Sequence, residues 1–484
     1  MCPCQLLEHN VNTTRFSQLT DPAGQLSVTN PATQSVIGRA RSYDGEAVSQ
    51  AIDKAENART GWAAKTARER ASILLSWHNL ILENVEDLAE IVTAECGKPL
   101  SEARGEIAYG ASFIQWFAEE GKRAYGETIP TFAPDKRVLT IQQPIGTCAA
   151  ITPWNFPVAM ITRKVAPALA AGCAMLVKPA EATPLSALAL EQLAHEAGVP
   201  HDVFRVMPTT DPEAIGDVFC NHPAIRKLSF TGSTNVGQIL MAKAAKNVVK
   251  LSLELGGNAP FIVFGDADID AAVEGAIASK FRNAGQTCIC ANRILVQDAV
   301  HDEFVERLTQ RVKQLKVGPG STEGVQIGPL INAKGIQKVS ELVDDAVQSG
   351  AMIVTGGEID EAGPLFYTPT VLTGVDASMA ITQTEIFGPV APIIRFKGEA
   401  DAIRMANDTP FGLAAYFYTR DIGRVWRVME GLEYGMVASN DGALSTEIAP
   451  FGGWKHSGIG REGSRHGLNE YLEIKYCLMG GVNK

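Results

Sequence analysis

The stretch TCAAITPWNFPVAMITRKVAPALAAGCAMLVKPAEATP, residues 147–184, decides the fold. Its apolar pattern predicts a strand over Thr147–Thr152, a helix over Val158–Ala171 and a second strand over Ala174–Lys178. The alternation continues with strands at Val203–Met207 and Lys227–Thr231 and with helices at Leu185–Ala197, Glu213–Cys220 and Val236–Ala245. Such repeats predict a parallel, doubly wound α/β sheet, whose ligands bind outside the carboxyl ends of the strands.

Three polar or glycine-bearing turns fall at such strand ends: Pro153–Pro157, Lys178–Glu181 and Thr231–Thr234. Gly232 and Gly237 precede a helix, whose N-terminus can bind a pyrophosphate through its backbone N–H groups. The spacing is not the usual G-x-G-x-x-G, so a plain tight turn is the alternative. Lys178 suits a phosphate or ribose, and the alternative is a surface lysine whose stem covers apolar groups. The convergence of three turns is a stronger signal of a ligand site than any one of them.

A second alternating segment follows Gly256 and predicts a second α/β domain. We expect its strands at Phe261–Phe264, Ile294–Gln297, Met352–Thr355, Pro392–Phe396, Ala414–Tyr418 and Met436–Ser439. We expect its helices at Ile269–Phe281, Val300–Leu315, Lys334–Gln348, Asp401–Ala406 and Ile422–Gly431.

Cys288 lies in the connection SKFRNAGQTCICANR, residues 279–293, between a predicted helix and a predicted strand. Upstream, the segment LELGG puts Glu254 at a strand end, before two glycines. A nucleophilic thiol and a carboxylate base are the minimum for covalent acyl chemistry, whereas a buried packing cysteine is the alternative. Since Cys288 belongs to the second domain and Lys178 to the first, a cleft between them would hold a cofactor opposite the thiol.

The remaining segments predict helices and an extension. Residues 1 to about 45 form short extended pieces broken at Asn30-Pro31 and Gly38, and a helical pattern, interrupted at Gly97-Lys98-Pro99, covers Asp44 to Gly121. Two extended pieces between Glu127 and Pro144 predict a hairpin, and Tyr471–Cys477 predicts a final strand. An apolar edge strand favours pairing with another subunit.

Composition excludes several classes of protein. The 484 residues are 20% charged and 45% hydrophobic with a net charge of −11, which predicts a folded protein of about three domains and argues against nucleic acid or an anionic membrane as the main partner. No apolar run reaches the ~18 residues of a membrane span, and the N-terminus does not resemble a secretory signal. Nine irregularly spaced cysteines predict reduced thiols in a cytoplasm, and Cys2 and Cys4 lack the neighbours of a metal site.

Seven ordered motifs make the chain resemble the aldehyde dehydrogenase superfamily, from about Asn30 to Tyr476. They are PWNFP at Pro153, KPAE at Lys178, FTGS at Phe230, LELGG at Leu253, GQTC at Gly285, EIFGP at Glu385 and PFGG at Pro450. In detail the chain most resembles the succinate-semialdehyde dehydrogenases. The resemblance implies an NAD-binding domain over residues 1–126 and 146–255, a catalytic domain over 256–440 and oligomerisation strands over 127–145 and 468–484, hence a homodimer or homotetramer.

The resemblance also implies a mechanism and its residues. Cys288 attacks the aldehyde to give a thiohemiacetal, and the Asn155 side chain with the Cys288 backbone N–H stabilises the oxyanion. Hydride transfer leaves a thioester, and Glu254 activates the water that hydrolyses it. Lys178 and Glu181 hold the adenosine ribose, Ser233 the pyrophosphate and Glu385 the nicotinamide ribose. The wider cofactor set adds Thr152, Pro153, Trp154, Gly232, Leu255 and Phe387.

Two further expectations concern the cofactor and the substrate. Glu181 accepts hydrogen bonds from ribose hydroxyls and repels a 2′-phosphate, so we expect NAD, with NADP as the alternative. The resemblance also implies a substrate clamp: Arg163 and Arg282 match arginines that hold the distal carboxylate in the succinate-semialdehyde enzymes, and Ser445 matches a partner hydroxyl. Guanidinium suits this role, because it binds carboxylate in bidentate fashion. Together the arginines favour a short ω-carboxy aldehyde. Structural ion pairs are the alternative for each arginine. Succinate semialdehyde is the expected substrate, and glutarate or 2-oxoglutarate semialdehyde would need the same clamp.

Other interpretations remain. A cofactor-free thiol hydrolase would need a histidine base, and none of the eight histidines lies near the strand-end motifs. A non-catalytic use of the fold would not require both Cys288 and Glu254. Cys290 is either a packing residue or the partner of Cys288 in a strained, reversible disulfide.

Overall fold

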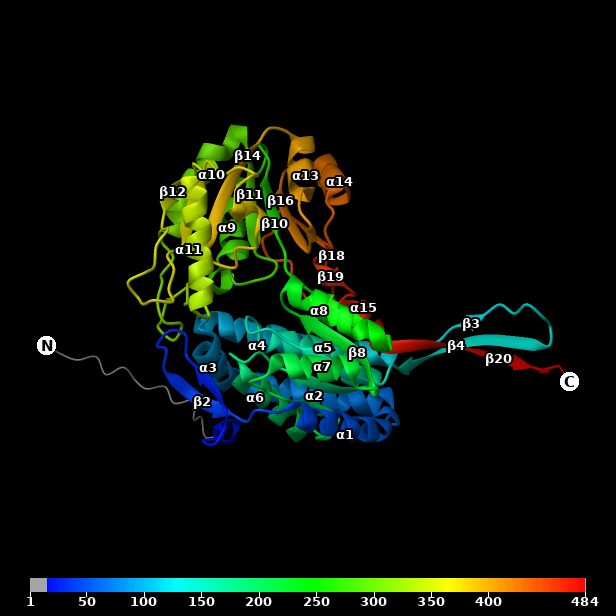
Figure 1. Ribbon diagram of the computed structural model, residues 1–484. Coiled ribbons are helices and arrows are strands. Elements are labelled where there is room, and N and C mark those ends of the chain that lie inside the picture. The colour runs from blue at the N-terminus through cyan, green and yellow to red at the C-terminus, as the bar shows by residue number, and fades with distance from the viewer. Residues whose placement is uncertain (1–14, 484) are drawn as a thin grey trace.

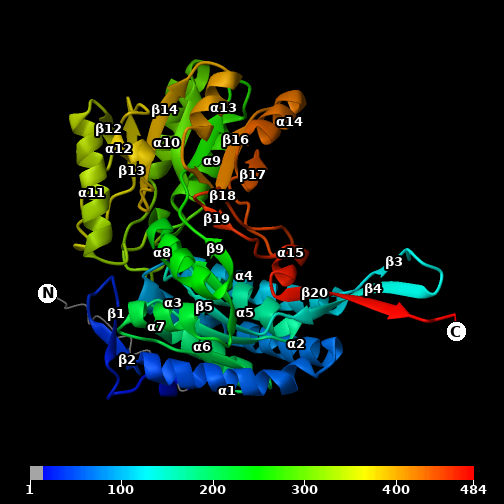
Figure 2. The same cartoon turned by 45° about the vertical axis from the view of Figure 1, so that its right-hand side comes forward.

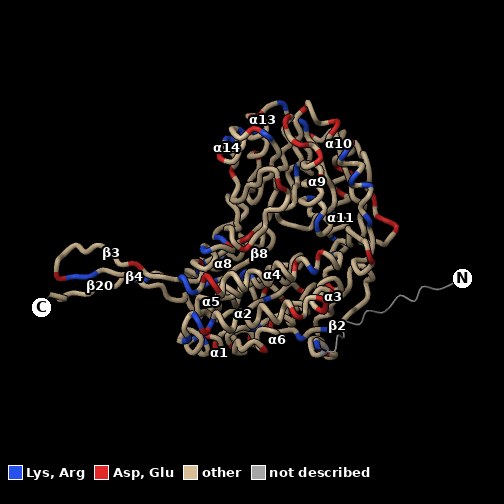
Figure 3. Tube along the Cα trace, turned by 180° about the vertical axis from the view of Figure 1, so that it is seen from behind, with Lys and Arg blue, Asp and Glu red and all other residues tan. Residues whose placement is uncertain are grey.

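The computed structural model describes residues 15–483, so the interpretation of Cys2 and Cys4 lies outside the described residues. It contains two sheet-centred bodies, one above the other in Figure 1, and a β arm that projects sideways from the lower body. Acidic and basic residues are interspersed over both bodies (Figure 3). Among the described residues, no helix is long and apolar enough to cross a membrane.

The lower body is built on a six-stranded sheet of order β19-β9-β8-β5-β6-β7. Its parallel strands are β5 (Thr147–Ile151), β6 (Ala174–Lys178), β7 (Phe204–Val206), β8 (Ile225–Thr231) and β9 (Lys250–Glu254), and β19 (Gly458–Ile459) is antiparallel to β9. The helices are α5 (Ala159–Ala171), α6 (Pro184–Glu196), α7 (Pro212–Asn221) and α8 (Thr234–Ala244). Along β5, Cys148 and Ala150 join one core cluster and Ala149 and Ile151 another. Both faces are therefore buried, which confirms the predicted doubly wound sheet.

Four helices precede this sheet: α1 (Gly45–Ala63), α2 (Ala67–Glu83), α3 (Val85–Cys96) and α4 (Leu100–Glu120). A capping box of Thr66 and Glu69 starts α2, and Gly97 ends α3 with φ 85°. Strands β1 (Leu26–Thr29) and β2 (Val36–Ala40) pair upstream. The predicted break at Gly38 is wrong, because Gly38 lies inside β2. A Cβ there would lie 2.6 Å from Thr20 Cγ2, so the glycine permits close packing.

The upper body is a seven-stranded sheet of order β12-β13-β14-β11-β10-β16-β17. Its strands are β10 (Ala259–Val263), β11 (Ala291–Gln297), β12 (Met352–Thr355), β13 (Thr370–Thr373), β14 (Val390–Phe396), β16 (Ala414–Tyr418) and β17 (Met436–Ser439). Its helices are α9 (Ile269–Lys280), α10 (His301–Val312), α11 (Ala333–Gln348), α12 (Ala380–Gln383), α13 (Glu399–Asn407) and α14 (Ile422–Gly431). The sequence did not predict β13, a fully buried run of four residues that has no polar alternation.

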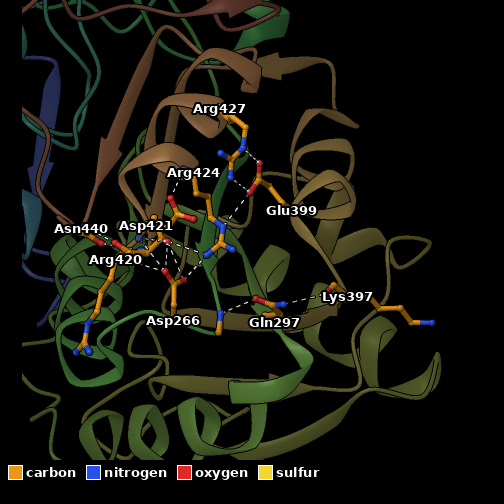
Figure 4. A network of polar contacts seen from close by, with 11 residues as sticks. Asp266, Gln297, Lys397, Glu399, Arg420, Asp421, Arg424, Arg427 and Asn440 are labelled. Atoms are coloured by element: carbon orange, nitrogen blue, oxygen red, sulfur yellow. Dashed lines mark hydrogen bonds and ion pairs between the residues drawn. The ribbon is translucent and has the colours of Figure 1, made fainter.

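A polar network ties the strand ends of this sheet to α14 (Figure 4). Asp266, just after β10, accepts hydrogen bonds from the Thr419 hydroxyl and from the backbone N–H groups of Arg420 and Asp421. Arg424 on α14 bridges Asp266 and Glu399. The loop between β16 and α14 is thereby fixed to β10.

The arm is a three-stranded antiparallel sheet of order β20-β4-β3 (Figures 1 and 2). It comprises β3 (Thr128–Ile129), β4 (Lys136–Pro144) and β20 (Leu472–Gly480), which confirms the predicted hairpin and final strand. Between β17 and the arm, the chain returns to the lower body. It does so through β18 (Trp454–Lys455), which pairs with β15 (Phe411–Gly412), through β19, and through α15 (Ser464–Asn469).

Candidate active site

Cys288 lies between α9 and β11, just after a short 3-10 turn over Arg282–Gly285. Asn283 and Ala284 in that turn have φ of 51° and 54°, a left-handed conformation that non-glycine residues seldom adopt. Gly285 follows with φ 75°, and a Cβ on it would lie 2.1 Å from Gly388 O. A strained backbone persists only where its surroundings determine it, so the thiol loop is held in one shape.

The Cys288 residue is half-buried, and its surroundings favour the neutral thiol. Burial raises the pKa of Cys288 to about 12, against a lowering by Arg163 and with smaller increases from Glu385 and from Glu254. The thiol therefore needs a proton acceptor before it can attack.

Glu254 ends β9 and is 2% exposed. Neither carboxylate oxygen has a hydrogen-bond partner among the described residues. Burial and then Glu462 raise the pKa of Glu254 well above its usual value, against smaller opposite effects of Arg163 and Lys164. A buried carboxyl without partners weakens the fold, and groups with strongly shifted pKa values are concentrated at functional sites, which makes Glu254 a candidate.

Asn155 lies in the turn after β5 and connects the two bodies. Its Nδ2 donates to Gln286 O at 3.0 Å, and its carbonyl oxygen accepts from Asn283 Nδ2 at 3.1 Å. Its Oδ1 is buried and has no partner within residues 15–483. A Cβ on Gly257, three residues after Glu254, would lie 2.5 Å from Cys288 O. The thiol loop, the asparagine turn and the end of β9 therefore meet.

The predicted adenosine-side residues gather at the carboxyl edge of the lower sheet. Lys178 ends β6, forms an ion pair with Glu181 and donates to Pro179 O at 2.9 Å. Thr152 N donates to Lys178 O at 3.1 Å, which joins the turns after β5 and β6.

The turn after β8 is the third at this edge. Ser233 caps α8, its hydroxyl accepting from Val236 N at 3.4 Å, and Gly232 N donates to Glu254 O at 3.0 Å. Gly237 does not precede the helix, as the sequence predicted, but lies inside α8. A Cβ on it would lie 2.5 Å from Leu255 Cδ2, so this glycine serves close packing.

The predicted nicotinamide-side residues reach over from the upper body. Glu385 Oε1 accepts from Gly257 N at 3.2 Å, and burial raises the pKa of Glu385 to about 7. Phe387, with φ 57°, packs edge-on against Trp154 at 5.7 Å. Trp154 and its neighbour Pro153 are both partly exposed. Two walls from different bodies therefore face one another, as a bound dinucleotide would require.

Arg282 and Ser445, two of the three residues predicted to hold the substrate, line one small cavity of about 70 Å³. Thr287, Ile289 and Tyr416 contribute to its wall, and the Arg282 guanidinium stacks 4.7 Å from the Phe156 ring centre. The third, Arg163, is fully buried, forms an ion pair with Glu462 and stacks on Phe451 at 4.1 Å. Its Nη2 has no partner in the described part of the chain. A role of Arg163 in binding substrate stays a prediction.

Sequence reasoning missed Tyr109. This tyrosine on α4 is partly exposed as a residue, but its hydroxyl is buried and has no hydrogen-bond partner over residues 15–483. The ring packs edge-on against Phe113 at 4.9 Å and against the Phe156 cluster. Burial raises the pKa of Tyr109, while Arg163 and Arg282 act to lower it, so the phenol lies within reach of both charges. Nothing in the helical pattern separated Tyr109 from the core-facing residues of α4.

Cys290 is buried, and its thiol donates to Lys280 O at 3.3 Å. Burial raises its pKa. Cys288 and Cys290 are both free thiols. No cluster of three or more His, Cys, Asp or Glu that could hold a metal occurs among residues 15–483.

Comparison with known proteins identifies the family. Residues 19–477 match the profile of the "Aldehyde dehydrogenase family". The chain belongs to the aldehyde dehydrogenase family. As a member it is an oxidoreductase that oxidises aldehydes with NAD or NADP.

Its relatives include proteins that act on ω-carboxy aldehydes. The chain is 58% identical to the succinate-semialdehyde dehydrogenase [NADP(+)] of Escherichia coli, over 94% of each chain. It is 55% identical to the glutarate-semialdehyde dehydrogenase of Pseudomonas aeruginosa, over 96% of this chain and 95% of the other. The crystal structure of succinate-semialdehyde dehydrogenase from Burkholderia pseudomallei superposes with a TM-score of 0.93 at 56% identity and 94% coverage of both chains.

Proposed function

We propose that this aldehyde dehydrogenase oxidises succinate semialdehyde to succinate. The observation that carries the proposal is the small cavity beside the Cys288 loop that contains both Arg282 and Ser445. A fixed cation and a hydroxyl in a confined space favour a short aldehyde with a distal carboxylate. The relatives' names support an ω-carboxy substrate, and glutarate semialdehyde is the nearest alternative.

In the proposed mechanism, Cys288 Sγ bonds to the aldehyde carbon as its proton passes to Glu254, directly or through one water. The raised pKa of the Glu254 carboxyl brings it closer to that of the thiol, which eases this transfer. Asn155 Nδ2 and the Cys288 backbone N–H donate to the oxyanion of the thiohemiacetal. The oxyanion collapses to a thioester as hydride leaves the same carbon. A bound nicotinamide supplies the acceptor for that hydride.

Hydrolysis completes the cycle. Glu254 first releases to solvent the proton that it took from the thiol. It then takes a proton from water as the water oxygen attacks the thioester carbon, and it returns that proton to Cys288 Sγ as the carbon–sulfur bond breaks. The products are the Cys288 thiol and succinic acid, which ionises to succinate. The residues present fit a dinucleotide. Gly232 keeps a Cβ away from the turn after β8, and Ser233 opens an eleven-residue helix whose N-terminus suits a pyrophosphate.

We infer NAD as the preferred cofactor. Glu181 lies at the carboxyl end of β6 with its side chain partly exposed, where a carboxylate would repel a 2′-phosphate. The E. coli relative is named for NADP(+), so the preference has to be measured. Glu181→Ser should narrow the ratio of kcat/KM for NAD over NADP, and an unchanged ratio would show that Glu181 does not contact the ribose.

The mechanism is tested by single-turnover formation of NADH. Cys288→Ala should abolish it, with Cys290→Ala as the matched control that keeps a normal first turnover. Glu254→Gln should slow NADH formation, because Glu254 takes the thiol proton, and should slow thioester hydrolysis still more, so that acyl-enzyme accumulates and is visible by mass. Full turnover by Cys288→Ala would overturn the mechanism. If wild type forms no NADH with succinate semialdehyde, the proposal that this aldehyde is the substrate is wrong.

We further infer a homo-oligomer, dimer or tetramer, assembled through the arm. Strand β20 lies at one edge of the arm, and Ile474 and Tyr476 on it are 72% and 57% exposed. An apolar edge strand needs a cover, and a second copy of the chain supplies one. The seven described cysteines are free thiols, which supports a reducing compartment such as the cytoplasm.

A further inference from the structure

Lys98, in the break between α3 and α4, is a lysine that the mechanism above does not use. Its side chain is fully buried. Its Nζ forms an ion pair with Glu106, donates to the carbonyl oxygen of Asn155 at 2.7 Å and lies 3.9 Å from the Phe156 ring centre. The ammonium therefore holds the backbone on which the proposed oxyanion donor is mounted.

Glu106, two turns into α4, holds the other side of the same turn. One carboxylate oxygen pairs with Lys98, and the other accepts from Val158 N at 2.8 Å and from Ala159 N at 3.3 Å. These two N–H groups lie at the start of α5, where a carboxylate is favourable. The ion pair thus holds residues 155–159 at both ends.

The same helix also holds the thiol loop. Glu102, one turn before Glu106, accepts from Asn283 N at 2.8 Å. Asn283 Nδ2 in turn donates to Asn155 O at 3.1 Å and to Gln286 O at 3.3 Å. Asn155 O therefore receives hydrogen bonds from Lys98 on one side and from the loop of Cys288 on the other. The start of α4 fixes two segments that belong to different bodies.

A buried ion pair such as Lys98–Glu106 adds little to the stability of the fold, so a positioning role would explain its presence. Removing two charges from water costs several kcal/mol per ion, and apolar residues of similar volume often stabilise a fold equally well. Here Lys98 Nζ makes two hydrogen bonds and a contact with the Phe156 ring, and both Glu106 oxygens accept hydrogen bonds. Each of the two groups holds backbone of residues 155–159. An oxyanion donor contributes when it is already aimed at the position that the oxyanion will occupy.

We propose that Lys98 and Glu106 are positioning residues for Asn155, which fix the peptide that carries its amide so that the amide points at the oxyanion. The inference rests on the proposed role of Asn155. It predicts that Lys98 and Glu106 act on the chemical step through Asn155 and leave the cofactor affinity unchanged.

The test is a double-mutant cycle between Lys98→Met and Asn155→Ala, with Glu106→Gln as a second probe. The readouts are single-turnover NADH formation and thiol-dependent hydrolysis of 4-nitrophenyl acetate, which needs Cys288 and the oxyanion donor but no hydride acceptor. Lys98→Met should slow both reactions by about tenfold to a hundredfold, the scale of a misplaced catalytic group. In the Asn155→Ala background, the same change should slow them less than threefold. The Kd for NAD should stay within twofold throughout.

Lys227→Met is the matched control, because Lys227 is also fully buried and pairs with Glu470 and the Ser252 hydroxyl, away from Asn155. Each variant is compared at a temperature at which circular dichroism shows it folded. Should Lys98→Met fail to fold, Glu106→Gln, which keeps the shape and the acceptor oxygen, carries the same cycle. Equal losses from Lys98→Met with and without Asn155, or equal losses in Lys227→Met, would overturn the inference. Full ester hydrolysis by Asn155→Ala itself would instead overturn the proposed function of Asn155.

Discussion

The two arginines of the proposed carboxylate clamp have different surroundings, so their variants should behave differently. Arg282 lines the small cavity, whereas Arg163 is paired with Glu462. Arg282→Ala should lower kcat/KM for succinate semialdehyde by a factor equivalent to about 1–3 kcal/mol. The kcat/KM for butanal should stay nearly unchanged, because butanal has no carboxylate for Arg282 to bind.

Arg163→Ala should lower activity on both aldehydes and destabilise the fold by about 3–5 kcal/mol, because within residues 15–483 it leaves the buried Glu462 paired with Lys164 alone. The measurements are kcat/KM for each aldehyde and denaturant unfolding. An equal fall in kcat/KM for both aldehydes in Arg282→Ala would contradict the proposal that succinate semialdehyde is the substrate. A selective loss of succinate semialdehyde in Arg163→Ala would show that this arginine also contacts the carboxylate.

The neighbouring thiols allow a test of redox control. Burial raises the pKa of both Cys288 and Cys290, and the Cys290 thiol is hydrogen-bonded to Lys280 O, so little thiolate is present to oxidise. We expect mild peroxide followed by dithiothreitol to restore wild type and Cys290→Ala to the same degree. Better recovery of wild type, together with an intramolecular disulfide by mass, would establish Cys290 as the partner of Cys288.

Among the helices and strands, the contact between α3 and α6 predicts a pH-dependent stability. Glu95 on α3 accepts from Leu185 N at 2.8 Å and Ser186 N at 3.0 Å, at the N-terminus of α6. Burial raises the pKa of Glu95 from 4.5 to about 8, against the lowering by a hydrogen bond from the Ser186 hydroxyl and by the two backbone N–H groups. The folded chain therefore holds a proton that the unfolded chain releases, and stability falls as pH rises from about 4.5 through about 8.

Glu95→Gln should remove this contribution, because the amide does not titrate, and its one oxygen still accepts from one of the two N–H groups. Between pH 5.5 and pH 8.5, the free energy of unfolding should fall more in wild type than in Glu95→Gln, by up to about 1.4 kcal/mol per pH unit. Urea unfolding at three pH values measures the difference. Parallel pH profiles would show that Glu95 stays ionised in the folded chain.

For helices and strands, the sequence could predict features that depend on neighbouring residues in the chain. The strands that carry Lys178, Thr231 and Glu254 at their ends follow from short apolar runs and the turns after them. The pairing of Arg163 with Glu462, 299 residues away, has no local signal. The same holds for the hydrogen bond from Lys98 to Asn155, 57 residues apart, which depends on how α4 packs against α5. Local patterns therefore predicted the strand ends that carry the candidate site residues, whereas the contacts that hold these residues needed the structure.

In the whole molecule, the arm is the feature that one chain leaves incomplete (Figures 1 and 2). Ile474, Tyr476 and Leu478 alternate along β20 and so share one face, where they are 72%, 57% and 45% exposed. Glu473 and Lys475 lie on the other face. Three strands without a packed layer on their apolar face gain little stability of their own. The apolar face therefore predicts an interface with a second copy.

Ile474→Asp combined with Tyr476→Asp should dissociate the oligomer to a lower mass, because two carboxylates in an apolar interface would lose their hydration without gaining partners. Lys475→Ser, on the opposite face of the same strand, is the control and should keep the mass of wild type. Size-exclusion chromatography with light scattering measures each mass, and activity should follow the oligomer only if assembly supports the active site. A wild-type mass in the double variant would show that this face of β20 is not the contact that joins the copies.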